Sequence, residues 1–412
     1  MRILAIETSC DETAVTLLDC RGSAEEFSAT VLGNALYSQV KKHAEFGGVV
    51  PHLAKREHAM NLVPLLEIVL AQAGLGIMAE RSIAPDVEEL LEGILSREHS
   101  MHESFISYLK THAKPDIDAV AVTYGPGLEP ALWVGINLGK AISIAWDIPM
   151  IPTNHMEGHI VSSMMRRTNT MEGAEDTYTM GFAPFPLLAL LISGGHTELV
   201  LMKKWIDFKV IGRTRDDAVG EAFDKVARML GLPYPGGVNL SNLAEEGRRI
   251  AHRAFAHPET IACLLPRPMI NAPNLDFSFS GLKTAVMYFL KEVPELTDYV
   301  KMKVAREFEE AVGDVLEAKV IRAIEQTKAK TLVIGGGVSA NKHLRLRFEH
   351  LVKNEYKDMQ LFVPESGLST DNAVMISMTA YLRSLFENHE LVDPMEVRAE
   401  GNLRLENAKA LV

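Results

Sequence analysis

The chain has few cysteines, no long apolar run and no excess of basic side chains, and each shortage excludes a class of protein. Among 412 residues, only Cys10, Cys20 and Cys263 are cysteines. Their wide, irregular spacing gives neither a disulfide framework nor a CxxC metal site. The longest apolar runs, such as Leu187 to Ile192, are far too short to span a membrane. The first residues contain no signal-peptide core, so a reducing, cytoplasmic location is expected.

The formal net charge is −12, which excludes a protein that coats nucleic acid non-specifically, because phosphate binding needs lysine and arginine. Any contact with nucleic acid must use a local basic patch or a partner. Lys41 and Lys42, followed by Lys55 and Arg56, are the candidates for such a patch. From charge alone, ordinary solvated faces are the better interpretation of both clusters.

The sequence uses two structural patterns twice. An apolar strand at Ile3 to Ile6 is followed by a hydroxyl-rich turn and a second strand at Ala14 to Leu18. Leu187 to Ile192 and Thr197 to Met202 repeat this hairpin around a Ser-Gly-Gly-His turn. Such hairpins, once in each half of the chain, favour two related lobes.

The second pattern is a buried strand, a glycine turn and a helix. It occurs at Asp118 to Thr123 with a helix over Pro130 to Trp146, and again at Thr331 to Ile334 with a helix from Ser339 onward. Short apolar strands that alternate with helices predict an α/β fold. A length of 412 residues suits two domains.

Two stretches look like additions to this plan. Gly76 to Lys114 is acidic, with apolar residues at helical spacing, and predicts a helical insertion. Arg166 to Pro186 is polar and rich in Gly, Thr and Met, which is typical of a linker between lobes. The tail after Asn388 shows little pattern.

His155 and His159 are four residues apart in HMEGH. On a helix, this spacing places both imidazoles on one face, as two ligands of one metal ion require. Glu157 points away from that face, whereas a zinc-protease HExxH helix has glutamate directly after the first histidine. Two surface histidines without a metal are the alternative, and spacing alone favours that alternative.

Two glycine turns could receive a nucleotide. The turn at Ser193 to Thr197 and the turn at Gly335 to Asn341 each follow a buried strand, and glycine N–H groups can point at phosphate oxygens. Ser339 is the expected N-cap of the helix after the second turn. Neither turn has GxGxxG or Walker A spacing, so plain packing turns remain the alternative.

Two acidic residues have open interpretations. Asp224 lies on an amphipathic helix over Asp217 to Leu230, where a surface ion pair with Arg228 is the simpler explanation. Asp371 precedes an apolar helical run, so it is either an N-cap or a carboxylate ligand of a metal.

Together these segments resemble one family, the bacterial TsaD-type tRNA threonylcarbamoyladenosine synthases, once described as sialoglycoprotein endopeptidases. The resemblance runs from Met1 to about Phe386, outside the Gly76–Lys114 and Arg166–Pro186 stretches. Its motifs are ETSCDET, HAEFGGVVPHLAKREH, GPGLEPALWVG, HMEGH, SGGHT, GEAFDKVARMLGLPYPGG, DFSFSGLKT, GGGVSAN and STDNAVMI. Val238 stands where the family often has proline.

The resemblance implies two ribonuclease-H-like lobes of the actin-like ATPase, sugar kinase and Hsp70 superfamily, with a nucleotide cleft between them. Residues 1–185 would form the N-terminal lobe, with an atypical helical insertion at about 76–114. Residues 186–370 would form the C-terminal lobe, and residues 371–412 would return to the first lobe.

The resemblance also assigns site residues. It implies that His155, His159 and Asp371 bind one divalent ion, Fe²⁺ or Zn²⁺. It implies that the threonylcarbamoyl-adenylate is contacted by Leu191, Ile192, Ser193, Gly194, Gly195, Asp224, Gly237 and Asn341. His196 is a candidate general base.

The implied reaction transfers a threonylcarbamoyl group from threonylcarbamoyl-AMP to N6 of the adenosine next to the anticodon's third base, in tRNAs that read codons beginning with A. A TsaB-like paralogue and a TsaE-like ATPase are the expected partners. Lys41, Lys42, Lys55 and Arg56 are the candidate tRNA contacts. A metalloprotease, a sugar-kinase-like ATPase and a non-catalytic scaffold are the rival hypotheses.

Overall fold

The computed structural model describes residues 1–23, 26–168, 176–181, 183–251, 263–387 and 392–407. The chain divides into two compact units. Unit 1 comprises Met1–Phe182 and Asp371–Val412, and unit 2 comprises Ala183–Thr370. The chain therefore leaves unit 1 once and returns to it after unit 2.

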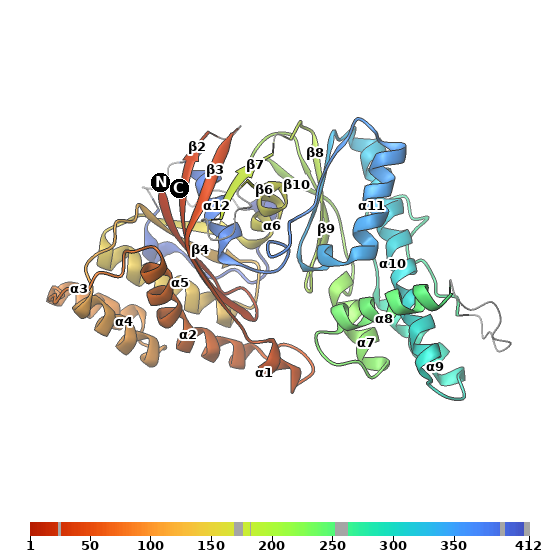
Figure 1. The fold of residues 1–412 in the computed structure, drawn as a ribbon, viewed down its shortest axis with the longest axis horizontal. Helices are drawn as coiled ribbons and strands as arrows, with labels where there is room; N and C mark the ends of the chain where they lie inside the picture. The colour runs from red at the N-terminus through yellow and green to blue at the C-terminus, as the bar shows by residue number, and fades with distance from the viewer. Residues whose placement is uncertain (24–25, 169–175, 182, 252–262, 388–391, 408–412) are drawn as a thin grey trace. The chain divides into compact units, whose positions relative to one another are not determined.

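The described part of unit 1 contains a seven-stranded sheet in the order β5-β4-β1-β2-β3-β7-β6 (Figure 1). Its strands are β1 (Arg2–Glu7), β2 (Glu12–Gly22), β3 (Phe27–Ser38), β4 (Ala119–Gly125), β5 (Met150–Asn154), β6 (Met165–Arg167) and β7 (Thr177–Met180). β1, β2 and β3 are antiparallel neighbours, whereas β4 and β5 run parallel to β1. The predicted first hairpin is confirmed as β1 and β2.

The described part of unit 2 repeats this plan. Its five-stranded sheet has the order β10-β9-β8-β11-β12, with β8 (Leu187–Ile192), β9 (Thr197–Met202), β10 (Phe208–Arg213), β11 (Thr331–Gly335) and β12 (Gln360–Phe362). Again a three-stranded antiparallel meander is followed by two strands parallel to its first strand. The same strand order in both units confirms the predicted α/β fold of two related lobes.

Helices cover both faces of the first sheet. The helices of unit 1 are α1 (Val40–Ala44), α2 (Pro51–Gln72), α3 (Pro85–Ile94), α4 (His99–Thr111), α5 (Glu129–Trp146), α6 (His155–Met164) and α12 (Ala373–Ser384). Leu4, Ile6, Val15 and Leu17 share one core with α2, α3, α4 and α5. Side chains alternate across a strand, so Ile3 and Ala5 face the other side, where α12 packs.

The core of unit 2 lies between its sheet and five helices, α7 (Val219–Met229), α8 (Gly236–Ala251), α9 (Ser280–Glu292), α10 (Asp298–Thr327) and α11 (Lys342–Glu355). A short 3-10 helix, η1 (Gly337–Ala340), precedes α11. The predicted amphipathic helix is confirmed as α7, whose Ala222, Phe223 and Val226 are buried. Among the described residues, none of the helices has both the length and the apolar character needed to cross a bilayer.

Of the two predicted additions, one differs from its expectation and one agrees with it. The segment interpreted as a linker pairs at both ends with the first sheet, because Met165–Arg167 and Thr177–Met180 form β6 and β7. Residues 169–175 and 182 of that segment lie outside the described residues. The 76–114 stretch contains α3 and α4, which agrees with its helical pattern.

Candidate metal centre and ligand cavity

The histidine pair lies at the start of α6, directly after β5. Oδ1 of Asn154 accepts hydrogen bonds from the backbone N–H groups of Met156 (2.9 Å) and Glu157 (3.2 Å), so the helix begins at His155. The i, i+4 spacing then brings His155 and His159 together, with ring centroids 4.7 Å apart. β1, β4 and β5 are parallel, and the pair therefore lies at the carboxyl edge where ligand sites of α/β sheets form.

Asp371 turns its carboxylate toward both histidines. Its Oδ1 lies 3.3 Å from His155 Nε2 and 3.2 Å from His159 Nε2. The three candidate ligand atoms all lie within 4.8 Å of one another. The helix α12 is instead capped by Asn372, whose Oδ1 accepts a hydrogen bond of 2.9 Å from the Met375 N–H. The N-cap interpretation of Asp371 is therefore wrong, and its interpretation as a metal ligand remains.

The surroundings of the three side chains fit a divalent ion. His159 is 1% exposed, and its Nδ1 has no hydrogen-bond partner among the residues that the structure describes. His155 Nδ1 lies 3.0 Å from Glu7 Oε2, so Nδ1–H donates to that carboxylate and Nε2 faces Asp371. Two imidazoles and one carboxylate suit zinc and iron alike, with positions left open for a substrate.

The charges around this site also favour a cation. Burial alone would lower the pKa of His155, but the carboxylates of Asp371 and Glu7 raise that pKa well above its usual value. Burial, with Asp11 and Asp371 nearby, raises the pKa of Glu12 to about 9. Several carboxylates thus lie close together in a buried space, and a bound cation would offset their mutual repulsion.

The other face of α6 holds this helix against α12. Glu157 is 1% exposed, and its Oε2 accepts a hydrogen bond of 2.7 Å from Arg383 Nε on α12. A Cβ on Gly158 would lie only 3.2 Å from Met375 Cγ. In the HMEGH motif, the histidines therefore face the candidate metal site, and the Glu-Gly pair contacts α12. The prediction that Glu157 points away from the histidine face is confirmed.

The partners of the histidines were not foreseen from the sequence. Thr123 Oγ1 donates to Glu7 Oε2 at 2.7 Å, and Ser9 Oγ lies 3.2 Å from His155 Nδ1. Glu7 ends β1 and Ser9 lies in the hydroxyl-rich turn that follows, and this turn was the one available signal. Nothing in their spacing indicates a contact with a residue almost 150 positions later.

In unit 2, some glycines at the two turns pack closely against neighbouring backbone, and others border open space. Gly336 has φ +90°, and a Cβ there would lie 2.5 Å from the Ile192 carbonyl oxygen. A Cβ on Gly220 would lie 2.6 Å from the Ser193 carbonyl oxygen. By contrast, Gly194 and Gly337 have no described atom within 4 Å of an added Cβ. The packing and ligand interpretations of these turns therefore apply to different glycines.

The helix after the second turn is capped by Asn341. Its Oδ1 accepts a hydrogen bond of 3.0 Å from the Leu344 N–H, and its Nδ2 donates to Glu309 Oε1 at 2.6 Å. Glu309 is completely buried. The expected N-cap, Ser339, is wrong because η1 inserts an extra turn before α11 begins.

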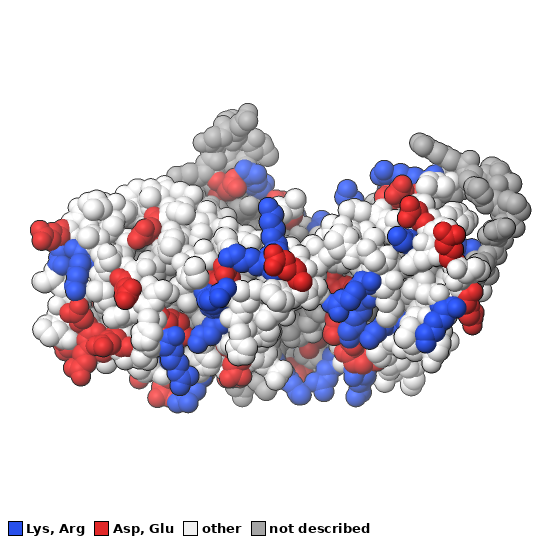
Figure 2. Space-filling model, turned by 90° about the horizontal axis from the view of Figure 1, so that it is seen from below, with Lys and Arg blue, Asp and Glu red and all other residues white. Residues whose placement is uncertain are grey.

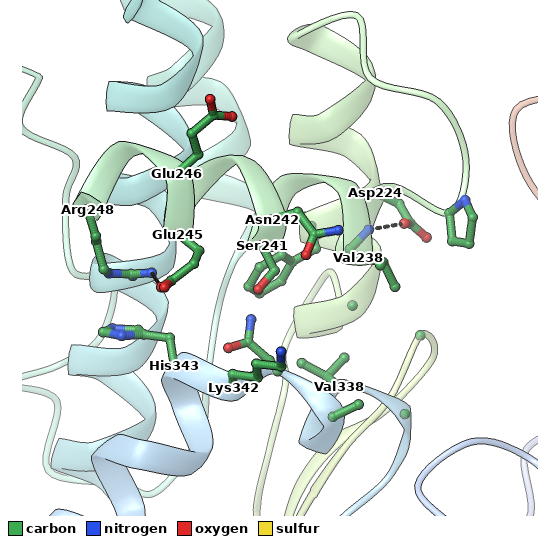
Figure 3. A pocket seen from close by; sticks show the side chains of 18 of the residues that line it. Asp224, Val238, Ser241, Asn242, Glu245, Glu246, Arg248, Val338, Lys342 and His343 are labelled. Carbon is green, nitrogen blue, oxygen red and sulfur yellow. Dashed lines mark hydrogen bonds and ion pairs between the residues drawn. The ribbon is translucent and has the colours of Figure 1, made fainter. Parts of the chain in front are cut away.

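A cavity of about 860 Å³ opens beside these turns (Figure 3). Ser241 and Asn242 on α8 face Val338 and Lys342 across it (Figure 3). The predicted substrate-binding residues that line it are Gly194, Asp224, Gly237 and Asn341. Asp224 Oδ1 accepts a hydrogen bond of 3.0 Å from the Gly237 N–H, which orders the turn between α7 and α8. The cavity therefore combines polar side chains with open glycine backbone, the features that small-molecule sites use to orient a ligand.

Other predicted contacts lie elsewhere. Leu191 and Ile192 are completely buried in β8 and are not among the residues that line the cavity. Ser193 and Gly195 are not among the residues that line the cavity. The backbone N–H of His196 donates to Ser193 Oγ at 3.1 Å, which fixes the hairpin tip. The catalytic role of His196 stays a prediction.

Most of the candidate tRNA-binding cations already have acidic neighbours. Lys42 Nζ lies 2.5 Å from Glu57 Oε2, and Lys55 Nζ lies 3.1 Å from Glu98 Oε1. The side chain of Arg56 is 69% exposed, and its Nη2 lies 3.8 Å from Oε1 of Glu57. On the face shown in Figure 2, acidic and basic side chains are interspersed. A tRNA site in this region cannot depend on charge alone.

The sequence matches one family model, TsaD: tRNA N6-adenosine threonylcarbamoyltransferase, over residues 30–84 and 99–378. The matched stretches contain the histidine pair, Asp371 and every residue named above as lining the cavity. Residues 85–98, which include α3, lie between the two stretches.

Solved structures give weaker likenesses. HypF from T. kodakarensis has 10% sequence identity and a TM-score of 0.48, over 93% of this chain and 48% of that one. Full-length HypF in a phosphate- and nucleotide-bound form has 11% identity and a TM-score of 0.43, over 94% of this chain and 47% of that one. YeaZ from Pseudomonas aeruginosa has 12% identity and a TM-score of 0.24, over 51% and 65%. The chain spans about half the length of HypF, and the fold assignment comes from the two sheets themselves.

Replacement of Gly336 by alanine is expected to destabilise unit 2 by about 2 kcal/mol or more, because the positive φ and the Ile192 carbonyl both oppose a Cβ. Gly337→Ala is the matched control, since its Cβ meets open space. Urea denaturation followed by circular dichroism measures both. Identical denaturation curves for the two variants would contradict this account of the turn.

Replacement of Arg383 by methionine is expected to cost about 3–5 kcal/mol, because it leaves the Glu157 carboxylate buried without its arginine. The double variant Glu157→Met/Arg383→Met removes both charges and should be the more stable of the two. Urea denaturation compares them, and chelator competition measures zinc affinity, which should fall roughly 10–100-fold in the single variant. Equal stability of single and double variants would show that the pair does not hold α6 against α12.

Proposed function

The chain belongs to the tRNA N6-adenosine threonylcarbamoyltransferase family, and from this membership we propose that it transfers a threonylcarbamoyl group from threonylcarbamoyl-AMP to an adenosine of tRNA. The family match over residues 30–84 and 99–378 is the observation that carries the proposal. The acceptor is the N6 amine of the adenosine next to the anticodon's third base, in tRNAs that read codons beginning with A.

The cavity of unit 2 is the proposed site for the adenylate part of the donor. Its volume, about 860 Å³, suits a nucleotide-sized ligand. The open backbone at Gly194 and Gly337 can approach phosphate oxygens closely, and N–H groups there can donate to them. Asp224 and Asn341 are held by hydrogen bonds to Gly237 and Glu309, so the polar wall of the cavity is already ordered.

His155, His159 and Asp371 are the proposed ligands of one iron or zinc ion. When bound, the ion would supply Lewis-acid stabilisation of developing negative charge and orient reacting oxygen atoms. The carboxylate of Glu7 accepts a hydrogen bond from His155 Nδ1–H, which leaves Nε2 of that ring as the ligand atom. The Glu157–Arg383 pair keeps α6 and α12 at the spacing that these ligands need.

The exocyclic amine of adenosine is a weak nucleophile, so positioning of donor and acceptor supplies much of the rate. The carbonyl of the donor is already activated, with AMP as its leaving group. Attack of N6 on this carbonyl forms the new C–N bond, and expulsion of AMP breaks the C–O bond to phosphate. The amine proton must then leave, and we assign its acceptance to His196 as part of the same proposal.

The expected partners are a TsaB-like paralogue and a TsaE-like ATPase, and the assay includes both. A tRNA substrate also agrees with the cytoplasmic location expected from three unpaired cysteines.

Two alternative functions, a zinc protease and a sugar-kinase-like ATPase, make different demands on these sites. A zinc protease needs a glutamate base beside its metal, but Glu157 is engaged by Arg383 on the opposite face of α6. A sugar-kinase-like ATPase would use the same cavity without the histidine pair. ATP turnover that needs neither tRNA nor the metal ligands would favour that second candidate.

Loss of the metal ligands is expected to abolish transfer. Unmodified tRNA is incubated with the chain, both partners, threonine, bicarbonate, ATP and the adenylate-forming enzyme, and its nucleosides are analysed by mass spectrometry. His155→Ala and Asp371→Asn should lose the bound metal and lower the rate by at least about 100-fold. His99→Ala, an exposed histidine of α4, is the control and should behave as the unchanged chain does. Full transfer by metal-free variants would refute the metal assignment, and no transfer by the unchanged chain would refute the proposed function.

His196→Gln is expected to lower the transfer rate by roughly 10²–10⁴-fold, the usual contribution of a positioned proton acceptor. Its metal content and its affinity for the adenylate should stay unchanged. The pH dependence of the rate separates this role from a structural one, because loss of a proton acceptor changes the shape of the profile, whereas a structural defect lowers the rate equally at every pH. An unaltered rate would remove His196 from the mechanism.

A further inference from the structure

An exposed aromatic side chain stands at the tip of the loop between α1 and α2. Phe46 is 64% exposed, the most exposed aromatic residue in the described part of the chain. The following Gly47 has φ +69°, which lets the chain turn sharply back toward α2. A single exposed apolar ring is common on protein surfaces, so the case for a function rests on how the loop holds the ring.

The loop is built on a buried histidine. His43 is completely buried, and its carbonyl oxygen accepts hydrogen bonds from the N–H groups of Phe46 (3.0 Å) and Gly48 (3.3 Å). Its Nδ1 accepts the Val50 N–H at 3.2 Å, and its Nε2–H donates to Gln39 Oε1 at 3.0 Å. His43 thus ties both ends of the loop together, and Phe46 is presented by an ordered backbone.

The same network reaches the turn beside the metal ligands. The Gln39 N–H donates to the Asp11 carbonyl oxygen at 3.0 Å, and Gln39 Nε2 donates to His58 Nδ1 at 3.3 Å. His58 Nε2–H in turn donates to the Cys10 carbonyl oxygen at 3.0 Å. Burial lowers the pKa of His58 to about 4, so its ring is neutral and can accept and donate at once.

Cys10 and Asp11 follow β1, whose last residue, Glu7, bonds His155. The exposed ring, the buried network and the metal ligands therefore belong to one ordered part of unit 1.

Exposed cations stand near Phe46 along the chain. Lys41 on α1 is exposed, and no described carboxylate forms an ion pair with it. Arg56 and His52 at the start of α2 are exposed as well. Glu45 is the opposing charge in the loop. Proteins bind single-stranded nucleic acid by combining aromatic stacking with phosphate contacts from cations, and this segment carries both kinds of side chain.

We propose that Phe46 is a stacking platform for an unpaired base of tRNA that neighbours the adenosine to be modified. This inference rests on the proposed function, since it takes tRNA as the substrate. An anticodon loop is single-stranded, and a base drawn out of its stack leaves its neighbour without a partner. Phe46 replaces that lost stacking partner, while Lys41 and Arg56 hold the adjoining phosphates. Stacking tolerates any base, so this contact positions the loop without reading its sequence.

The test compares Phe46→Leu, which keeps an apolar side chain without a ring, with Phe46→Trp, which keeps the ring. Tyr288→Leu is the control, because Tyr288 is another exposed aromatic residue, on α9 of unit 2. Each full-length chain, with its partners present, is titrated with unmodified tRNA at fixed salt. A second set of titrations uses an anticodon stem-loop that carries 2-aminopurine beside the target adenosine.

Phe46→Leu should weaken tRNA binding by about 5- to 100-fold and raise KM for tRNA with little change in kcat, while metal content and adenylate affinity stay constant. Phe46→Trp should bind as tightly as the unchanged chain. The fluorescence change of 2-aminopurine on binding should be lost only in Phe46→Leu. Tyr288→Leu should change none of these values.

Unaltered tRNA binding and 2-aminopurine fluorescence in Phe46→Leu would overturn the inference. Impaired assembly with the partner proteins at unchanged tRNA affinity would also overturn it and would identify a protein-docking residue. If the unchanged chain modified tRNA while Phe46→Leu matched it, only the stacking role would fail. If the unchanged chain neither bound nor modified tRNA, the proposed function would fail with it.

Discussion

The candidate metal centre depends on one constraint, the approach of a single carboxylate to two imidazoles in a buried space. His155 and His159 come from the first turns of α6, and Asp371 comes from the residue before the cap of α12. Small changes in the spacing of these helices would separate the ligand atoms. The Glu157–Arg383 ion pair, the close contact at Gly158 and the caps Asn154 and Asn372 all act on that spacing. Charge, packing and helix boundaries thus support the same geometry.

The two units build different sites on one strand order. In unit 1, the edge at the carboxyl ends of β1, β4 and β5 holds the histidine pair and its carboxylate neighbours. In unit 2, the corresponding turns after β8 and β11 are rich in glycine and border the cavity. The difference lies in the turns: the first unit has side chains that are candidate ligands of a cation, and the second has exposed backbone that we propose for an anion.

Much of the fold followed from local patterns. Both hairpins and both strand–glycine–helix segments were predictable because their apolar runs are short, uniform and bounded by turn residues. The third strand of each meander was not, since β3 and β10 mix buried and exposed residues irregularly. Two helix caps were displaced by one or two residues because Asn341 and Asn372 compete with Ser339 and Asp371 as caps. The Glu7 contact to His155 and the Glu98 contact to Lys55 join distant positions, which no local spacing encodes.

X-ray absorption spectroscopy of the zinc- or iron-loaded chain tests the central claim most directly, because it reports the atoms bound to the ion. The account predicts two histidine nitrogens and further oxygen ligands, with zinc–nitrogen distances of about 2.0–2.1 Å and no sulfur. The imidazole scattering should be halved in a His159→Ala chain that still holds metal. A sulfur ligand, or a spectrum unchanged by that substitution, would contradict the assignment of the ion to His155, His159 and Asp371.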